Sequence, residues 1–374
     1  MAEAVTETIL ATMKNHFGNA SSVHSFGQTA KSIIDAARGK VADLIGATPQ
    51  EIVFTSGGTE SNNLALRGVT GRISTKKRRI IVSAIEHEAV LKTVKDLDEQ
   101  RWSISLVPAD SDGLILPEEL EKMITSDTAL VSVMHANNEI GTIQPIKQLA
   151  EIAHNHGALF HVDAVQSAGK LPISVKTLGV DLLSLSAHKF NGPKGVGALW
   201  IKRGLRLSPH NTGGRQERSR RAGTENVPAL SGFGVAADIA KQKLVEHSKT
   251  IGNLRDRLES GILSAVSGTV VNGTEKQRIA NTTNISFDRI EAESLLIALD
   301  LEGIAVSTGS ACSSGTLEPS HVLKAMGLSP HRTQSSIRFS LGLGNSQKHI
   351  DHAVEIMPRV VDRLRRLSFS GLRQ

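Results

Sequence analysis

The feature that most constrains this chain is a regular alternation of two patterns along its first two hundred residues. Short apolar runs rich in β-branched residues predict strands, and helical three- and four-residue spacing recurs between several of them. Strands that alternate with helices form a mostly parallel, doubly wound α/β sheet. The expected strands are residues 51–55, 79–85, 104–109, 129–134, 158–164, 181–186 and 197–202, with helices at 2–16, 27–46, 117–124 and 146–157.

From about residue 230 the pattern changes to that of a smaller α+β domain. It predicts a long helix at 229–266, a strand at 283–287, a helix at 291–301, a strand at 336–342 and a closing helix from about 347. We therefore expect a large domain over residues 1–245 and a small domain over residues 246–374. A chain of 374 residues is also too long for one ordinary core, which favours two domains.

Composition excludes several classes of protein. No apolar run approaches the roughly 18–20 residues of a membrane span, and the first residues lack a secretory signal pattern. Aromatic residues make up 3% of the chain and tyrosine is absent, so the stacking platforms of single-strand nucleic-acid binders are missing. The single cysteine excludes an intramolecular disulfide and a CxxC metal site. We expect a cytoplasmic protein that binds no metal, membrane or nucleic acid.

That single cysteine, Cys312, lies in the stretch STGSACSSGT. A cysteine retained for packing normally lies in an apolar run, whereas this one is surrounded by serine, threonine and glycine. Such a setting lets a thiolate form and reach another molecule. Taken alone, Cys312 is an accessible thiol, and oxidation or adventitious metal binding would explain it equally well.

Two of the segments that follow expected strands suggest a site for a phosphorylated aldehyde. After the strand 51–55, SGGTESNNLAL places Gly58 and Thr59 at a helix start, where free N–H groups and the helix dipole favour an anion. The alternative is an ordinary turn capped by Thr59. After 181–186, Lys189 stands beside Ser186 and His188. A lysine there could form a Schiff base, although most lysines are only surface charges.

Three further segments add polar groups after strands, each with an ordinary explanation. Asp163 could hold a protonated ring nitrogen or cap a helix, and Gln166 follows one turn later. His87 could stack on a ring or move protons, or be a half-buried histidine. Asn138 could bind a phenolic oxygen or a carboxylate, or serve turn chemistry. The helix start at Gly58 and Thr59 would form an anion cup. Together with this cup and Lys189, these groups match the requirements of a pyridoxal phosphate site.

With these motifs in place, the chain resembles the cysteine desulfurases of the nitrogen-fixation and iron–sulfur-cluster type, within the class V aminotransferase superfamily. The resemblance covers nearly the whole chain. It rests on GNASSVHSFGQTAK, EIVFTSGGTESNNLAL, HANNEIGTIQPI, FHVDAVQSAGK, SAHKFNGPKGVGAL, RRAGTENV, STGSACSSGTLEPSHVLKAMG and SSIRFSLG. It implies a fold-type I pyridoxal-phosphate transferase in which residues 1–245 bind the cofactor.

The resemblance also implies a role for each site residue. Lys189 would hold the cofactor aldehyde, Asp163 would pair with its ring nitrogen, and His87 would stack on the ring and move protons. The ring hydroxyl would contact Gln166 and Asn138, and the phosphate would bind Gly58, Thr59, Ser186 and His188. Thr224 would reach the phosphate of a second subunit, so a homodimer is implied. Arg338 would bind the substrate carboxylate, a bidentate task that suits a guanidinium, with Asn138 beside it.

The implied reaction converts L-cysteine to L-alanine and leaves a persulfide on Cys312. The sulfur would then pass to an acceptor or scaffold protein, for iron–sulfur cluster assembly or thiolation. The glycine- and serine-rich surroundings of Cys312 resemble the branch in which this loop moves to deliver sulfur.

The chain departs from the family pattern in several places. The family begins with a strand and an Ala-Thr-Thr turn, whereas this chain starts at what looks like the following helix. Arg215 replaces a usual glycine, Asn191 a common tyrosine and Ala20 a usual proline. Arg215 is expected to adopt a positive φ, at a cost of about 1 kcal/mol. The alternatives are a truncated non-catalytic homologue that dimerises or binds partners, and a selenocysteine lyase.

Overall fold

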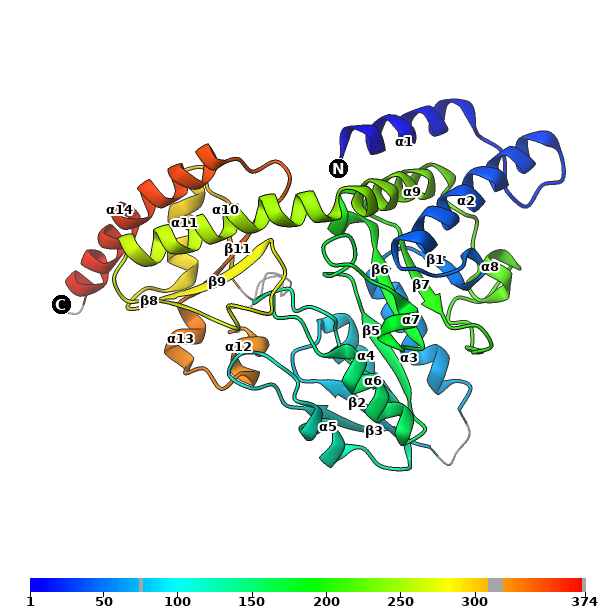
Figure 1. Ribbon diagram of the computed structural model, residues 1–374, viewed down its shortest axis with the longest axis horizontal. Coiled ribbons are helices and arrows are strands. Elements are labelled where there is room, and N and C mark those ends of the chain that lie inside the picture. The colour runs from blue at the N-terminus through cyan, green and yellow to red at the C-terminus, as the bar shows by residue number, and fades with distance from the viewer. Residues whose placement is uncertain (74–76, 309–318, 372–374) are drawn as a thin grey trace. The chain divides into compact units, whose positions relative to one another are not determined.

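The computed structural model describes residues 1–73, 77–308 and 319–371 (Figure 1). The chain divides into two compact units. The first unit comprises residues 1–107, 117–135 and 144–244, and the second comprises residues 108–116, 136–143 and 245–374. Most of the second unit is therefore the expected small domain, to which two short segments from the expected large domain are added. Among the described residues, no helix is long and apolar enough to cross a membrane.

The first unit is built on a sheet in which the structure describes seven strands, in the order β1-β7-β6-β5-β4-β2-β3. Neighbours from β6 through β3 are parallel, and β7 is antiparallel to both β6 and β1. The strands are β1 (Ile52–Thr55), β2 (Arg79–Ser83), β3 (Ser103–Val107), β4 (Thr128–Ser132), β5 (Leu159–Asp163), β6 (Leu182–Ser186) and β7 (Gly197–Ile201). The expected mostly parallel α/β fold is confirmed.

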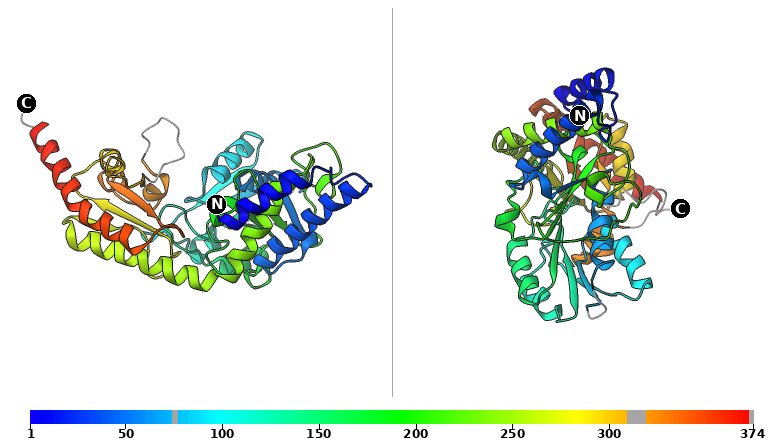
Figure 2. Two further views of the ribbon diagram at one scale, coloured as in Figure 1. Left: turned by 90° about the horizontal axis from the view of Figure 1, so that it is seen from above. Right: turned by 90° about the vertical axis from the view of Figure 1, so that its right-hand side faces the viewer.

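Helices pack on both faces of this sheet, which explains why its strands read as continuous apolar runs (Figure 2). Strands β4, β6 and β7 are buried at every residue, whereas only Val107 of the edge strand β3 is buried. The helices of this unit are α1 (Glu3–Asn15), α2 (Ser25–Leu44), α3 (Gly58–Thr70), α4 (Glu88–Glu99), α5 (Pro117–Met123), α6 (Ile146–Asn155), α7 (Val175–Leu178), α8 (Gln216–Ser219) and α9 (Val227–Gln242), with 3-10 turns η1 (Pro49–Glu51) and η2 (Ala187–Phe190).

The second unit contains a separate antiparallel sheet in the order β10-β11-β9-β8. Its core includes Leu258, Phe287, Leu295, Ile337 and Met357, all buried. The elements of this unit are α10 (Leu244–Ala265), β8 (Thr269–Val271), β9 (Thr282–Phe287), α11 (Ala292–Asp300), β10 (Ser307–Thr308), α12 (His321–Ala325), α13 (Pro330–Gln334), β11 (Ser336–Ser340) and α14 (Gln347–Gly371).

The prediction of a single long helix at 229–266 is wrong in one respect, because the structure contains two helices there. Helix α9 ends at Gln242 and α10 begins at Leu244, and between them Lys243 has φ −103° and ψ 10°. No proline or glycine marks this break in the sequence. It coincides with the boundary between the two units, so tertiary packing rather than local propensity divides the helix.

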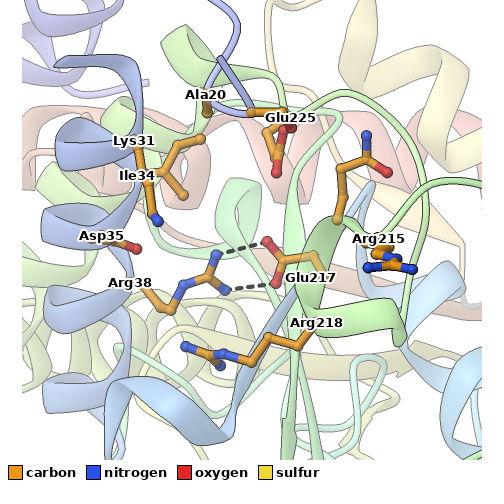
Figure 3. Close-up of a pocket in the computed structure, with 11 residues that line it drawn as sticks. Ala20, Lys31, Ile34, Asp35, Arg38, Arg215, Glu217, Arg218 and Glu225 are labelled. Atoms are coloured by element: carbon orange, nitrogen blue, oxygen red, sulfur yellow. Dashed lines mark hydrogen bonds and ion pairs between the residues drawn. The ribbon is translucent and has the colours of Figure 1, made fainter. Parts of the chain in front are cut away.

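A buried ion pair fastens the short α8 segment to the edge of the large sheet (Figure 3). The Arg38 guanidinium on α2 donates to both carboxylate oxygens of Glu217, at 2.6 and 2.7 Å. Glu217 also accepts a hydrogen bond from the Phe54 amide of β1 at 2.9 Å, and the guanidinium lies 4.5 Å from the centre of the Phe54 ring. The pair flanks a cavity of about 760 Å³ lined by Lys31, Arg215, Arg218 and Glu225 among others.

The expected positive φ at Arg215 is wrong, because this residue has φ −88°. The left-handed conformation falls instead on Glu217, Arg218 and Ser219, with φ 45°, 57° and 61°. The chain must turn there for the Glu217 side chain to reach the buried Arg38. The ion pair therefore compensates for a strained turn that non-glycine residues seldom adopt.

We predict that Glu217→Gln lowers the free energy of unfolding by about 3–5 kcal/mol, because it leaves the buried Arg38 charge uncompensated. Glutamine keeps the size and backbone preferences of glutamate closely enough for charge loss to dominate. The measurement is urea unfolding followed by circular dichroism. Arg359→Ala, which removes an exposed pair with Glu302, is the control and should change stability by about 1 kcal/mol or less. Equal effects of the two variants would contradict the prediction.

Candidate active site

The parallel strands bring residues from distant parts of the first unit to one edge of its sheet. Strands β2, β5 and β6 run in the same direction, and β1 shares it because both β1 and β6 are antiparallel to β7. Their carboxyl ends therefore meet at one edge, where ligands bind in sheets of this type. The residues that follow these ends are those that the sequence singled out, near Gly58, His87, Asp163 and Lys189.

Asp163 is the last residue of β5 and is buried, with 5% of its surface exposed. Its carboxylate accepts hydrogen bonds from the Asn62 amide at 2.7 Å and from the Val165 backbone at 2.9 Å. Burial raises the pKa of Asp163, although these donors and the nearby charges of His87 and Lys189 oppose the rise. A buried carboxylate with a raised pKa is well suited to a positively charged partner.

Asn62 belongs to the site but was missed by sequence reasoning. It lies on α3, is fully buried, and orients one oxygen of Asp163. Its own side-chain oxygen has no hydrogen-bond partner among the described residues. The only sequence signal was its place in SGGTESNN, where it follows the glycine pair by one helical turn. Nothing in that pattern names the aspartate, which is 101 residues away.

His87 caps the N-terminus of α4, where its Nδ1 accepts a hydrogen bond from the Ala89 backbone at 3.0 Å. In the neutral ring this bond places the proton on Nε2. The side chain is half-buried, as its ordinary explanation required. Its proximity acts to lower the pKa of Asp163. Its cap position fixes the ring through Nδ1.

Glu86, next to His87, is a second residue that the sequence analysis missed. It is fully buried and accepts hydrogen bonds from the Met134 backbone at 2.6 Å and from the Ser83 hydroxyl. Burial raises the pKa of Glu86 to about 8, and the charge of Asp163 raises it further. Glu86 therefore joins the β2–α4 connection, which carries His87, to the end of β4, and it is protonated at neutral pH.

The helix start of the expected anion cup follows β1 directly, and its N-cap differs from the alternative considered. The N-cap of α3 is Gly57, and Thr59 is an exposed residue inside the first helical turn, so the alternative of Thr59 as the cap is wrong. A β-carbon on Gly58 would lie 2.7 Å from the Val165 side chain, so the close approach of these segments requires glycine. The first amides of the helix have no intrahelical acceptor and so favour an anion.

Glu60 ties this cup to the loop that carries Thr224. Its carboxylate accepts a hydrogen bond from the Ser56 backbone at 2.7 Å and pairs with Arg221 at 2.7 and 3.2 Å. Burial acts to raise the pKa of Glu60, but Arg221 and Ser56 outweigh it, so the pKa is lowered. Thr224 is exposed and lines a cavity of about 100 Å³ together with Ser56.

Lys189 lies in the 3-10 turn η2 that follows β6 and is exposed. The Ser186 hydroxyl and His188 Nδ1 are 2.9 Å apart. Partial burial lowers the pKa of His188, and the nearby lysines, Lys189 among them, lower it further. Asn191 ends the turn in the left-handed conformation, with φ 66°, which asparagine tolerates better than a bulky residue. The departure from tyrosine at this position therefore suits the backbone.

The remaining expected site residues are distributed between the two units. Gln166, in the first unit, accepts a hydrogen bond from Lys170 at 2.8 Å. Asn138 and Arg338 belong to the second unit, where Arg338 Nη1 donates to the Asn138 carbonyl at 3.2 Å. Arg338 Nε is buried and has no hydrogen-bond partner among the described residues. Cys312 lies outside the described residues.

A buried histidine joins the three strands below this edge. His161 Nδ1 lies 2.8 Å from the Ser132 hydroxyl on β4, and its Nε2 lies 2.9 Å from the Ser184 hydroxyl on β6. Burial lowers the pKa of His161 to about 3, so the ring is neutral. The three side chains hold β4, β5 and β6 together two residues before Asp163. In the described part of the chain, no cluster of His, Cys, Asp and Glu could hold a metal ion.

The fold and this arrangement of residues define the class of protein. The Aminotransferase class-V family model matches residues 1–352, and the chain belongs to this family. The protein called cysteine desulfurase IscS from Methanosarcina thermophila is 49% identical over 97% of this chain and 90% of its own length. Cysteine desulfurase 2 from Trichormus variabilis is 47% identical over 97% of this chain and 91% of its own length.

Solved structures give the same result for the fold. A NifS-like protein is 39% identical and covers 97% of each chain with a TM-score of 0.92. The structure described as SspA in complex with cysteine is 35% identical, with a TM-score of 0.81 over 91% of this chain and 95% of its own. The resemblance to cysteine desulfurases that the sequence motifs indicated is confirmed.

We predict that Glu86→Gln makes the protein relatively more stable as the pH rises from about 5 to 8. The pKa of Glu86 is about 8 in the folded protein and 4.5 in a model compound, so the folded state retains a proton that the unfolded state loses in this range. Its contribution to stability therefore falls as the pH rises, by at most about 1.4 kcal/mol per pH unit. Glutamine removes that loss.

The measurement is the difference in unfolding free energy between the two proteins, from urea titrations at several pH values. Taking the difference cancels the contributions of other titrating groups to the free energy of unfolding. A difference that stays constant between pH 5 and 8 would contradict the assignment of a protonated Glu86.

Proposed function

We propose that this protein is a pyridoxal-phosphate-dependent cysteine desulfurase that converts L-cysteine to L-alanine and receives the sulfur on Cys312 as a persulfide. The observation that carries the proposal is the position of Asp163. This buried carboxylate, held by Asn62, lies at the same sheet edge as a glycine-lined helix N-terminus and Lys189. An anion cup, a buried carboxylate and a lysine are the groups that a phosphorylated pyridine aldehyde requires.

The residues present fit this cofactor. The first amides of α3, with Gly58 and Thr59, would receive the phosphate, assisted by Ser186 and His188. Asp163 has a raised pKa in a buried setting, which a cationic ring nitrogen would relieve. His87 would stack on the ring, and Gln166 would contact its hydroxyl. When bound, pyridoxal phosphate supplies an electron sink for the electrons left on the substrate as bonds to its carbons break.

The side chains of this chain would then divide the remaining work. Arg338 would bind the substrate carboxylate through its charge, with Asn138 beside it. His87, with Nδ1 held by the Ala89 amide, would transfer protons through Nε2. The Cys312 thiolate would attack the sulfur of bound L-cysteine, so that an S–S bond forms as the C–S bond breaks. The carbon then takes up a proton and L-alanine leaves.

We further propose that the persulfide sulfur passes to an acceptor protein for iron–sulfur cluster assembly or thiolation, in the cytoplasm. The names of the relatives, cysteine desulfurase IscS and cysteine desulfurase 2, support a desulfurase over a selenocysteine lyase. The similar structure described as SspA in complex with cysteine supports cysteine as substrate. Retention of Asp163, Lys189 and His87 at one sheet edge supports an active enzyme over a non-catalytic homologue.

The direct test is incubation of the purified protein with pyridoxal phosphate and L-cysteine, followed by measurement of alanine and sulfide. We expect both products, an absorbance band from the bound cofactor that Lys189→Ala abolishes, and loss of alanine formation in Cys312→Ala because the sulfur has no acceptor. Alanine formation that survives in Cys312→Ala would exclude the persulfide role. A cofactor band that is absent, or unaffected by Lys189→Ala, would favour the non-catalytic homologue.

A second prediction concerns the homodimer, in which Thr224 would reach the cofactor phosphate of the other subunit. In a heterodimer of Lys189→Ala and Thr224→Ala subunits, one site combines both defects and the other has neither. Random mixing should therefore recover about a quarter of wild-type activity from these two impaired homodimers. The subunits are exchanged by dilution and reassembly, and the dimer is verified by sedimentation. If mixing only averages the two parent activities, Thr224 acts within its own subunit.

A further inference from the structure

A buried carboxyl group lies beside the proposed substrate-binding residues and has no part in the reaction described above. Glu139 follows Asn138 directly, and only 3% of its surface is exposed. Its carboxylate accepts a hydrogen bond from the Ser320 hydroxyl at 2.5 Å. Ser320 is itself 4% exposed and caps α12 by accepting a hydrogen bond from the Leu323 backbone at 3.2 Å. One carboxyl group thus joins the segment 136–143 to the start of α12.

The same segment is attached to the small sheet through two neighbouring side chains. Arg338 on β11 is directly opposite Asn284 on β9, so both side chains point to one face of the sheet. Arg338 donates to the carbonyl of Asn138 at 3.2 Å, and Asn284 donates to the carbonyl of Glu139 at 3.2 Å. Two adjacent carbonyls of the segment are therefore held by two adjacent residues of the sheet.

The orientation of Asn284 is itself fixed. Its side-chain oxygen accepts a hydrogen bond from Asn272 at 2.7 Å, which leaves its amide nitrogen directed at Glu139. The loop backbone is shaped by Asn137, whose side-chain oxygen accepts from the amides of Glu139 and Ile140 at 2.8 and 3.1 Å. Residues 141–143 at the end of the segment pair with the backbone of residues 277–279. The Glu139 carboxyl attaches the segment on a different side, that of α12.

We propose that Glu139 is a positioning residue for Arg338: by holding Ser320, it keeps the Asn138 carbonyl where it orients the guanidinium toward a ligand carboxylate. The inference rests on the proposed function, in which Arg338 binds the carboxylate of L-cysteine. With Nη1 occupied by Asn138, the guanidinium keeps its buried Nε, which has no hydrogen-bond partner among the described residues. An unpaired donor in a half-buried guanidinium matches a carboxylate ligand.

The electrostatics agree with this arrangement. Burial raises the pKa of Glu139 to about 7, while the Ser320 hydrogen bond and the charge of Arg338 act in the opposite direction. The effect of Arg338 shows that the two groups are within electrostatic reach. Glu139 nonetheless makes its hydrogen bond to Ser320, and the guanidinium of Arg338 bonds the Asn138 carbonyl, so no salt bridge between Glu139 and Arg338 is present among the described residues.

The test compares steady-state kinetics of full-length, cofactor-loaded variants with L-cysteine. Glu139→Ala should raise KM about tenfold and change kcat by no more than about twofold, since it weakens carboxylate binding rather than the chemical steps. Glu139→Gln keeps an acceptor for Ser320 and should recover most of this loss. An unchanged KM in Glu139→Ala, or an equal KM in the two variants, would overturn the proposal.

Ser320→Ala tests the same contact from its other side, because it leaves Glu139 intact and unpaired. Its matched control is Ser329→Ala, which removes the serine cap of another short helix, α13, where Ser329 accepts from the Arg332 backbone at 3.3 Å. Ser320→Ala should raise KM several-fold and Ser329→Ala should leave it unchanged. Equal effects would mean that loss of any cap disturbs the unit, and would overturn the proposal.

The decisive readout is a double-mutant cycle with Arg338→Ala. If Glu139 acts through Arg338, then adding Glu139→Ala to Arg338→Ala changes KM by less than about twofold. Additive effects would overturn the proposal. Should the wild-type enzyme release no alanine, the proposed function fails, and the same cycle is then run on the calorimetric dissociation constant of L-alanine, a probe with the same carboxylate. The two experiments therefore distinguish a wrong role for Glu139 from a wrong proposed function.

Discussion

The common direction of the strands in the large sheet is the constraint on which the candidate active site depends. Among the strands described, β7 alone runs against the others, and it lies between β1 and β6 so that both keep the common direction. Residues that follow β1, β2, β5 and β6 therefore meet at one edge, although Gly58 and Lys189 are 131 positions apart. A different register or direction for any one strand would move its polar residue to the opposite edge.

Holding that edge requires buried polar groups, and the structure pairs most of their polar atoms, with the side-chain oxygen of Asn62 left unpaired among the described residues. Asn62 and the Val165 amide support Asp163, and Ser132 and Ser184 hold the neutral ring of His161. A buried polar group without a partner would cost about 1–3 kcal/mol, so each pairing also specifies which strands are neighbours. The same contacts that stabilise the sheet thus set the positions of the candidate site residues.

Much of the fold and the site was predictable because the signals were local. The period of the apolar residues indicated the strands, and the residues after them included Gly58, His87, Asp163 and Lys189. What could not be predicted were side chains whose partner is distant in sequence. Asn62 meets Asp163, Glu86 meets the Met134 amide, and Glu139 meets Ser320, over separations of 101, 48 and 181 residues. No local pattern encodes such pairings in a single sequence.

The incorrect prediction of backbone conformation has the same origin. A left-handed conformation was expected at Arg215. The structure has this conformation at Glu217 through Ser219 instead, where the Glu217 carboxylate pairs with the buried Arg38. The sequence by itself determined the class of fold, the order of its elements and the types of residue after each strand, because these follow from periodicity and turn chemistry. Only the tertiary structure decided which buried groups are paired, which carboxyl groups are protonated and where the chain is strained. Those properties depend on burial and on neighbours that are brought together only when the sheets form.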